Sequence, residues 1–90
     1  MNEFKLIIAT PEGNIFDGDA VSIMLRGSEG DLAILKGHIP FITAVKPCDC
    51  HVELPDGSNK SYEIDGGILT VAQDSVTLLA GTAEKTTNHI

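Results

Sequence analysis

The chain has 90 residues, of which 42% are hydrophobic, and carries a net charge of −7 from 13 acidic and 6 basic residues. This length is enough for one domain with a packed core but too short for two independent cores. Because a polyanion repels nucleic acid and anionic lipid, the charge excludes nucleic-acid binding and favours a neutral or basic protein partner. No run approaches the roughly 18–20 continuous apolar residues of a membrane span, and no secretion signal is recognisable at the N-terminus. We therefore expect no direct membrane insertion and a location in the cytoplasm.

Apolar and polar residues alternate along most of the chain with the period of two that is typical of half-buried strands. In chain order, the residues that share one face are Phe4, Leu6 and Ile8; Val21, Ile23 and Leu25; Tyr62 and Ile64; and Val76 and Leu78. Turn-forming stretches separate these runs, and no window of a dozen residues keeps helical spacing without a Gly or Pro inside it. The sequence therefore predicts an all-β fold, a compact β-sandwich or flattened barrel of about ten short strands.

The stretch EGDLAILKGHIP, residues 29–40, changes character twice within a short distance. An acidic turn leads into an apolar run, and a Lys-Gly-His step ends that run just before Pro40. The segment 28–31 also matches a helix capping box, but a helix here would be barely two turns long before Gly37 and Pro40. We therefore predict a turn that enters a short strand whose apolar residues point into the core.

Two further elements follow in the second half of the chain. Asp56 and Gly57 lie between two alternating runs, which is a strong hairpin signal, so we pair residues of about 50–54 with about 60–65. The last six residues, 85–90, are polar and without pattern, so we expect a short frayed tail after a single domain that spans residues 1–84.

The segment Cys48-Asp49-Cys50-His51 resembles a soft-metal site, since thiolate and imidazole suit zinc or copper. Alternation places Cys48 and Cys50 on one face of a strand and Asp49 and His51 on the other. No second ligand pair exists elsewhere to complete a tetrahedral site. We therefore interpret both cysteines as small buried residues and predict no metal site.

Motifs for catalysis are missing as well. The sequence contains no Gly-x-Ser-x-Gly elbow and no Gly-Lys-Ser/Thr phosphate element. His38 could act as a base and Asp31 as the residue that orients it, but an extended segment of this length separates its ends by up to roughly 23 Å. We therefore predict no catalytic residue, no cofactor and no enzymatic activity.

Several segments form a set in a fixed order over about residues 3–84. They are Thr10-Pro11-Glu12-Gly13, Phe16-Asp17-Gly18, Glu29 to Pro40, Gly66-Gly67-Ile68 and Leu79-Ala80-Gly81-Thr82-Ala83. Together they resemble the N-terminal β-sandwich domain of the epsilon subunit of bacterial F-type ATP synthase, the counterpart of the mitochondrial delta subunit. The chain departs from the family pattern where it has Arg26 and Lys36 in place of the usual Pro, and Ala33 in place of Gly.

The resemblance implies a non-catalytic rotor component of the central stalk that couples ion translocation to ATP synthesis. In this family the domain packs on the gamma subunit and rests on the polar loops of the membrane c-ring, so both are implied partners. The implied location is peripheral, on the cytoplasmic face of the inner (plasma) membrane. The ring-contact candidates carried over from the family are Glu29, Asp31, Gly37, His38 and Ile39.

Family members typically continue into two C-terminal helices that carry inhibition and, in some members, bind ATP. The chain ends at Ile90, so we expect it to bind no nucleotide and to exert no helix-mediated inhibition. An exposed apolar patch is expected for gamma, but the pattern does not separate its residues from core residues. The alternative is a free-standing β-sandwich that binds a ligand or acts as an adaptor, since a fold does not fix a function.

Overall fold

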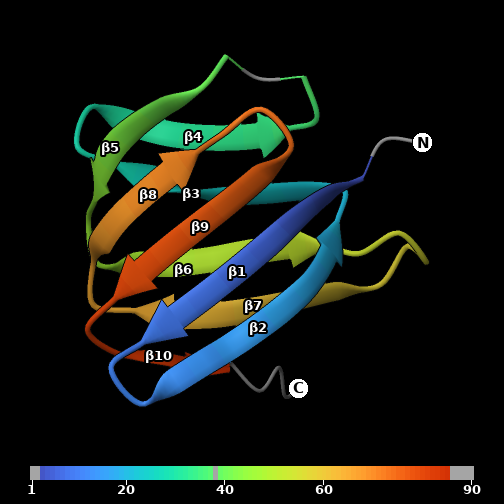
Figure 1. The fold of residues 1–90 in the computed structure, drawn as a ribbon. Helices are drawn as coiled ribbons and strands as arrows, with labels where there is room; N and C mark the ends of the chain where they lie inside the picture. Colours follow the sequence, from blue (N-terminus) through green and yellow to red (C-terminus); the bar gives the residue numbers. More distant parts are fainter. Residues whose placement is uncertain (1–2, 38, 86–90) are drawn as a thin grey trace.

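The computed structural model describes residues 3–37 and 39–85, and within this part of the chain every regular element is a strand. In chain order the strands are β1 (Phe4–Thr10), β2 (Gly13–Ala20), β3 (Ser22–Gly27), β4 (Gly30–Leu35), β5 (Phe41–Val45), β6 (Cys48–Glu53), β7 (Asn59–Ile64), β8 (Gly67–Val71), β9 (Ser75–Ala80) and β10 (Ala83–Lys85) (Figure 1). The predicted all-β fold of short strands is therefore confirmed. The described residues include no helix long and apolar enough to cross a membrane.

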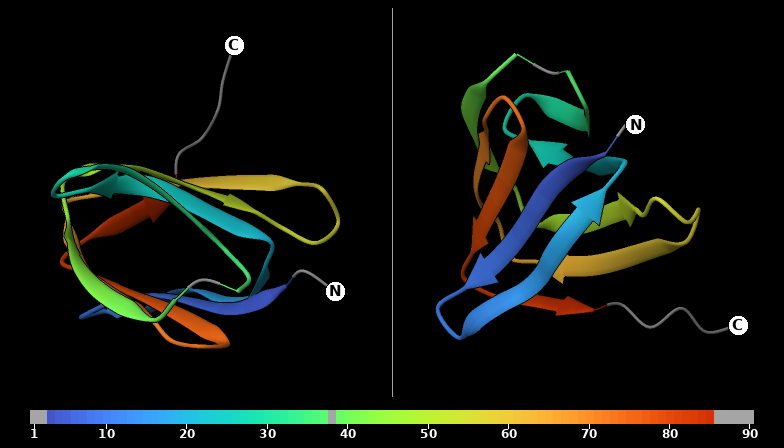
Figure 2. Two further views of the ribbon diagram at one scale, coloured as in Figure 1. Left: turned by 90° about the horizontal axis from the view of Figure 1, so that it is seen from above. Right: turned by 45° about the vertical axis from the view of Figure 1, so that its right-hand side comes forward.

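The strands form two layers that face each other across the core (Figures 1 and 2). One layer has the order β5, β8, β9, β1, β2, and the other has the order β10, β7, β6, β3, with β4 on the remaining side of β3. Strands β1 and β9 are parallel, whereas the other paired strands are antiparallel. The two layers join where β3 reaches β5, at the pair Gly27 and Val45.

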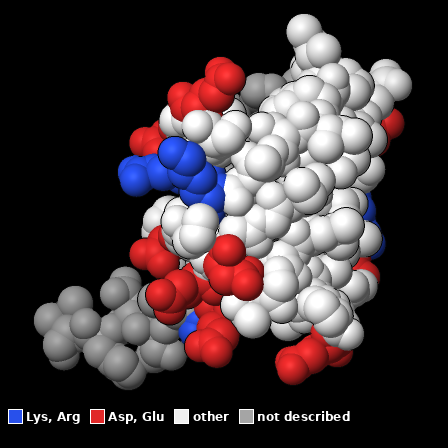
Figure 3. Space-filling view, turned by 90° about the vertical axis from the view of Figure 1, so that its left-hand side faces the viewer, with Lys and Arg blue, Asp and Glu red and all other residues white. Residues whose placement is uncertain are grey.

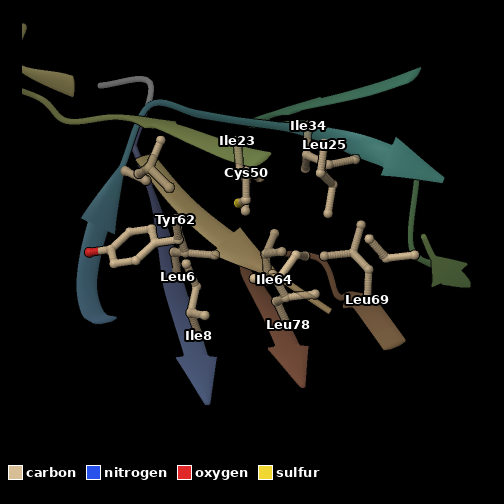
Figure 4. Packing of buried hydrophobic residues seen from close by; sticks show 14 of the residues in the cluster. Leu6, Ile8, Ile23, Leu25, Ile34, Cys50, Tyr62, Ile64, Leu69 and Leu78 are labelled. Carbon is tan, nitrogen blue, oxygen red and sulfur yellow. The ribbon is translucent and has the colours of Figure 1, made fainter. Parts of the chain in front are cut away.

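The inner faces of both layers are apolar, and several of their side chains are shown in Figure 4. The buried residues are Phe4, Leu6, Ile8, Ala20, Ile23, Leu25, Ile34, Val45, Cys50, Val52, Tyr62, Ile64, Leu69, Val71, Val76, Leu78 and Ala80. Among the described residues no polar or charged side chain is buried. The residues that alternation assigned to shared faces are buried, except Val21, which is half-buried and precedes β3.

The predicted hairpin in the second half of the chain is confirmed. Strand β6 pairs with β7 along its whole length, and it begins two residues earlier than expected, at Cys48. In the turn between them, the Asp56 carboxylate accepts hydrogen bonds from the Ser58 hydroxyl (2.6 Å) and the Ser58 N–H (2.9 Å). Both hydrogen bonds lower the pKa of Asp56, and the bond from the hydroxyl has the larger effect. Of the expected tail, Lys85 belongs to β10, and residues 86–90 lie outside the described part of the chain.

The Gly66-Gly67 step has a steric reason. Gly66 has a φ of +98°, a conformation that side chains disfavour. At Gly67, an added Cβ would collide with the backbone carbonyl of Leu79 on the neighbouring strand β9. Strands β8 and β9 can therefore pair closely at this end only because residue 67 has no side chain.

We expect Gly67→Ala to lower the free energy of unfolding by about 3 kcal/mol or more, because the backbones of β8 and β9 must separate to admit the methyl group. Urea unfolding followed by circular dichroism measures this change. Gly18→Ala is the matched control, since its Cβ would meet the Phe16 ring at an ordinary 3.6 Å. A change within about 0.5 kcal/mol is expected for that control. Similar losses in the two variants would contradict the steric explanation.

Candidate functional site

The hairpin formed by β3 and β4 carries the acidic end of the candidate site. Gly27 pairs with Gly30, so that only Ser28 and Glu29 form the loop between the two strands. Gly30 has a φ of +132°, which allows this tight connection. Both Glu29 and Asp31 are exposed at this end of the molecule. The predicted turn into a strand is confirmed, and no helix forms here.

Asp31 lies directly opposite Arg26 on the neighbouring strand. The Nε of Arg26 donates to Oδ1 of Asp31 at 3.1 Å, with 61% and 80% of the two side chains exposed. Such an exposed ion pair adds little to folding stability. It does give the Asp31 carboxylate a preferred position at the surface.

The other end of β4 carries the remaining candidates. Gly37 has a φ of +93° and lies in the turn after the strand. Ile39 is 80% exposed, the highest exposure among the large apolar side chains described. His38, which lies between them, falls outside the described residues. The structure thus shows Glu29 and Asp31 before β4, or at its beginning, and Gly37 and Ile39 beyond its end.

The expectation that the apolar residues of β4 all enter the core is wrong. Ile34 is buried and Leu32 is half-buried, but Ala33 and Leu35 are exposed. Because successive side chains of a strand point to opposite faces, a run of four apolar residues cannot point one way. Leu35, with half of its side chain accessible, lies on the outer face together with Asp31.

Two hollows flank the β3–β4 hairpin, and Asp31 and Leu32 line both of them. The first has a volume of about 360 Å³, and its lining also includes Met24, Leu25, Arg26, Pro47, Cys48, Asp49 and His51. The second has a volume of about 340 Å³, and its lining also includes residues 27–30 and 41–43. Both hollows thus adjoin the acidic end of the candidate site.

The cysteine segment follows the predicted alternation, but the interpretation that both cysteines are buried is correct only for Cys50. Cys50 is fully buried. Its burial, and to a smaller extent the neighbouring Cys48, raises the pKa of its thiol to about 12. Cys48 is half-buried, and its Sγ accepts the N–H of Arg26 at 3.4 Å. His51 points to the outer face, with its Nδ1 2.9 Å from the Ser61 hydroxyl. Within the part of the chain that the structure describes, no three His, Cys, Asp or Glu side chains form a group that could hold a metal ion.

A surface that the sequence did not locate lies on the outer side of the β5–β8–β9–β1 layer. Cross-strand neighbours form two rows here: Ala44, Ile68, Leu79 and Ala9 in one, and Ile42, Thr70, Thr77 and Ile7 in the other. We name these eight residues the uncharged face. Ile42, Ile68 and Leu79 are 70%, 45% and 51% exposed. Figure 3 shows a broad area without acidic or basic side chains on this side of the molecule.

The sequence analysis did not locate the uncharged face, because alternation shows which residues share a face of a strand but not which strands lie side by side. The segments FITAV, GILTV and SVTLLA are apolar or hydroxyl-bearing on both faces. This lack of a charged outer face is the signal that could have revealed it, since sheets that meet water usually alternate apolar with polar residues.

Comparison with known proteins identifies the family. Residues 3–86 match the family model of the β-sandwich domain of the ATP synthase delta/epsilon chain. The chain belongs to this family. It is 39% identical over 79 residues to the ATP synthase epsilon chain of a Nitratiruptor species, an alignment that covers 88% of this chain and 61% of that protein. The chain thus spans less than two thirds of this relative.

Two solved structures share the fold. A chain of the Euglena gracilis mitochondrial ATP synthase matches with a TM-score of 0.87 and 24% identity, over 92% of this chain and 53% of that chain. A chain of the Tetrahymena thermophila mitochondrial ATP synthase matches with a TM-score of 0.72 and 14% identity, over 88% of this chain and 63% of that chain.

We expect iodoacetamide at pH 8 to modify Cys48 in the folded protein and to leave Cys50 unmodified. The thiolate is the reactive form, and a thiol whose pKa is raised to about 12 stays protonated at this pH and is also buried. Mass spectrometry of peptides after timed labelling measures both rates. In Cys48→Ser the folded protein should take up no label, and both cysteines of the wild type should react in urea. Equal rates for the two cysteines in the folded wild type would contradict this assignment.

Proposed function

We propose that the chain is a non-catalytic rotor subunit of the central stalk of an F-type ATP synthase, where it couples ion translocation to ATP synthesis. The observation that carries this proposal is the family match over residues 3–86. The curated relative is an ATP synthase epsilon chain. Of the two structures that share the fold, one contains OSCP, F1 and the c-ring, and the other contains the central stalk and the c-ring.

The uncharged face supports a stable contact with the gamma subunit. Its exposed Ile42, Ile68 and Leu79 lie on three neighbouring strands and have no acidic or basic residue directly between them. Contiguous apolar surface of this kind is typical of protein interfaces, because its transfer out of water contributes roughly 25 cal/mol per Å². The rigid sheet beneath it gives a platform that can rotate with gamma as one body.

The end of the molecule that carries β4 supports a different contact, with the polar loops of the c-ring. The proposed contact residues are Glu29, Asp31, Gly37, His38 and Ile39. Of these, Glu29 and Asp31 are charged and exposed, and Gly37 and Ile39 are exposed beyond the other end of β4, an arrangement that suits a polar partner contacted at more than one point. The pair of surfaces would place this domain between gamma and the ring.

Within this role the chain is peripheral to the membrane, on its cytoplasmic face, and is held there through the complex. In this role the domain over residues 1–84 binds its partners and contributes no catalytic residue.

One prediction from the proposed function concerns the uncharged face. Leu79→Lys is expected to weaken binding to an F1 part depleted of its epsilon chain by about tenfold or more, because a charge must then be buried against gamma. Titration monitored by fluorescence anisotropy measures this affinity. Met24→Lys is the matched control: Met24 is 52% exposed, against 51% for Leu79, but lies in the other layer. Equal weakening by both substitutions would remove the assignment of the uncharged face to gamma.

The second prediction concerns the ring-facing end. Asp31→Arg is expected to bind the depleted F1 part as the wild type does, but to restore ion-driven ATP synthesis at least about fivefold less well in a depleted, matched-species synthase. Glu12→Arg makes the same charge change in the turn between β1 and β2, at the opposite end of the molecule from β4, and should restore synthesis fully (Figure 1). Failure of the wild type to bind and to restore synthesis would overturn the rotor role.

A further inference from the structure

The outer side of the layer formed by β3, β6, β7 and β10 is acidic, in contrast to the uncharged face of the other layer (Figure 1). Its exposed carboxylates are Asp49, Glu53, Glu63 and Glu84. Among the described residues that these four strands direct outward, Arg26 is the one Lys or Arg, and its Nε donates to Asp31 on β4. This side of the molecule therefore carries negative charge that no basic side chain of its own balances.

Three of these carboxylates lie in one row across neighbouring strands. Asp49 is paired with Glu63, and Glu63 is paired with Glu84. Like charges directly opposite each other destabilise a sheet. Within the described part of the chain, none of the three side chains forms an ion pair. We name these three residues the acidic row, which lowers the stability of the free chain and has no described partner of opposite charge.

The acidic row runs into the larger of the two hollows, because Asp49 also lines that hollow. Its volume is about 360 Å³, and the apolar part of its lining consists of Met24, Leu25, Leu32, Pro47 and Cys48. The exposed side chains of Arg26 and His51 also belong to the lining, so the hollow opens on the same side of the layer as the row. An apolar side chain of a partner can be buried in it while the charged groups at its mouth stay in water.

The spacing of the acidic row indicates the shape of a partner. Neighbouring strands lie about 4.8 Å apart, so the row spans roughly 10 Å from Asp49 to Glu84 and runs across the strands. In an α-helix, residues at i, i+3 and i+7 lie on one face and span about 10.5 Å. An extended segment directs only alternate residues to one side, so three of them span about 13 Å. A helix that crosses the strands therefore matches the row better than an extended segment does.

The charge of this surface decides the class of partner. It repels nucleic acid and anionic lipid. A second copy of the chain has the same net charge of −7, and its described residues include no α-helix. A basic helix of a different protein is therefore the occupant that both charge and spacing favour.

We propose that the acidic row and the adjoining hollow bind an α-helix of another protein. The helix carries basic residues at i, i+3 and i+7, which pair with Asp49, Glu63 and Glu84. At i−4, one turn before the first of them, it carries a large apolar residue that fills the hollow. The acidic row contains no residue of the uncharged face and none of the residues proposed to contact the ring. The inference therefore goes beyond the proposed rotor function and is tested separately from it.

The first test compares two peptides of identical composition against the full chain. Both are Ala-rich helices of about 18 residues with one Leu and three Lys. The striped peptide has Lys at i, i+3 and i+7 and Leu at i−4, whereas the dispersed peptide directs the same residues to different sides of the helix. The striped peptide should bind at least about tenfold more tightly in fluorescence anisotropy at low salt. Circular dichroism checks that both peptides are equally helical.

Either of two results of the first test would overturn the inference. Equal affinities of the two peptides would show attraction to net charge alone. Absence of binding by the striped peptide would show that the surface takes no basic helix.

The second test changes the centre of the row. Glu63→Gln keeps the size of the side chain and removes the charge that faces both Asp49 and Glu84. This variant should bind the striped peptide about fivefold less tightly, yet its urea midpoint should rise, because the like-charge repulsion is relieved. Glu12→Gln is the matched control: it removes the same charge from the exposed turn between β1 and β2 and should leave both quantities unchanged. Equal losses of affinity in the two variants would contradict a specific site.

The third test concerns the hollow. Replacement of the Leu in the striped peptide by Ala should weaken binding to the wild-type chain by about fivefold, because no large apolar side chain then fills the hollow. In an NMR titration with the striped peptide, the amide signals of Met24, Asp49 and Glu63 should shift, while that of Ile68 on the uncharged face should not. Unchanged affinity after the replacement, or shifts centred on Ile68, would overturn the inference.

Discussion

The fold depends on one strand, β3, which joins the two layers. Its first half pairs with β6, and its end turns to β5, where Gly27 faces Val45. The N–H of Ser28 donates to the carbonyl of Ala44 (3.2 Å), and the N–H of Lys46 donates to the carbonyl of Arg26 (2.9 Å). This short set of bonds joins the layers around a single core. It also brings the β3–β4 hairpin to one end of the molecule.

The sheet is irregular where β3 stops pairing with β6 and begins to pair with β5. After Met24, which still pairs with His51, the backbone of β3 moves away from β6. The N–H of Arg26 meets the sulfur of Cys48 instead of a backbone carbonyl. The larger hollow lies at this place, which explains why Cys48 is half-buried while Cys50, two residues further on, is fully buried. The geometry of the strands thus explains why the two cysteines, although spaced like metal ligands, differ in burial.

Much of this fold was predictable from alternation and turn residues, since a period of two assigns inner faces directly. Leu6, Ile23 and Leu78 are examples in which a local pattern and the final burial agree. The path of β3 was not predictable, because it depends on pairing between strands distant in sequence. The outward direction of Leu35 was missed because an uninterrupted apolar run carries no information about its two faces.

The candidate site was predictable only in part, for a related reason. The family resemblance supplied Glu29 and Asp31 as loop residues, and the hairpin that presents them follows from the adjacent glycines. It could not supply the Arg26 ion pair, because the family usually has proline at that position. Nor could it supply the uncharged face, whose rows combine residues from four strands.

The uncharged face and the β4 end affect the stability of this small domain in different ways. A chain of this length buries only about 60–65% of its unfolded surface, so its stability when free is modest. Exposed Ile42, Ile68 and Leu79 add nothing to that stability in water, but they contribute once a partner covers them. The surface charges act differently: the Arg26–Asp31 pair is too exposed to stabilise the fold, and it can exchange partners at small cost. In the proposed rotor role, firm binding through the uncharged face and a lighter contact at the β4 end would suit a subunit that stays fixed to one neighbour while it contacts another.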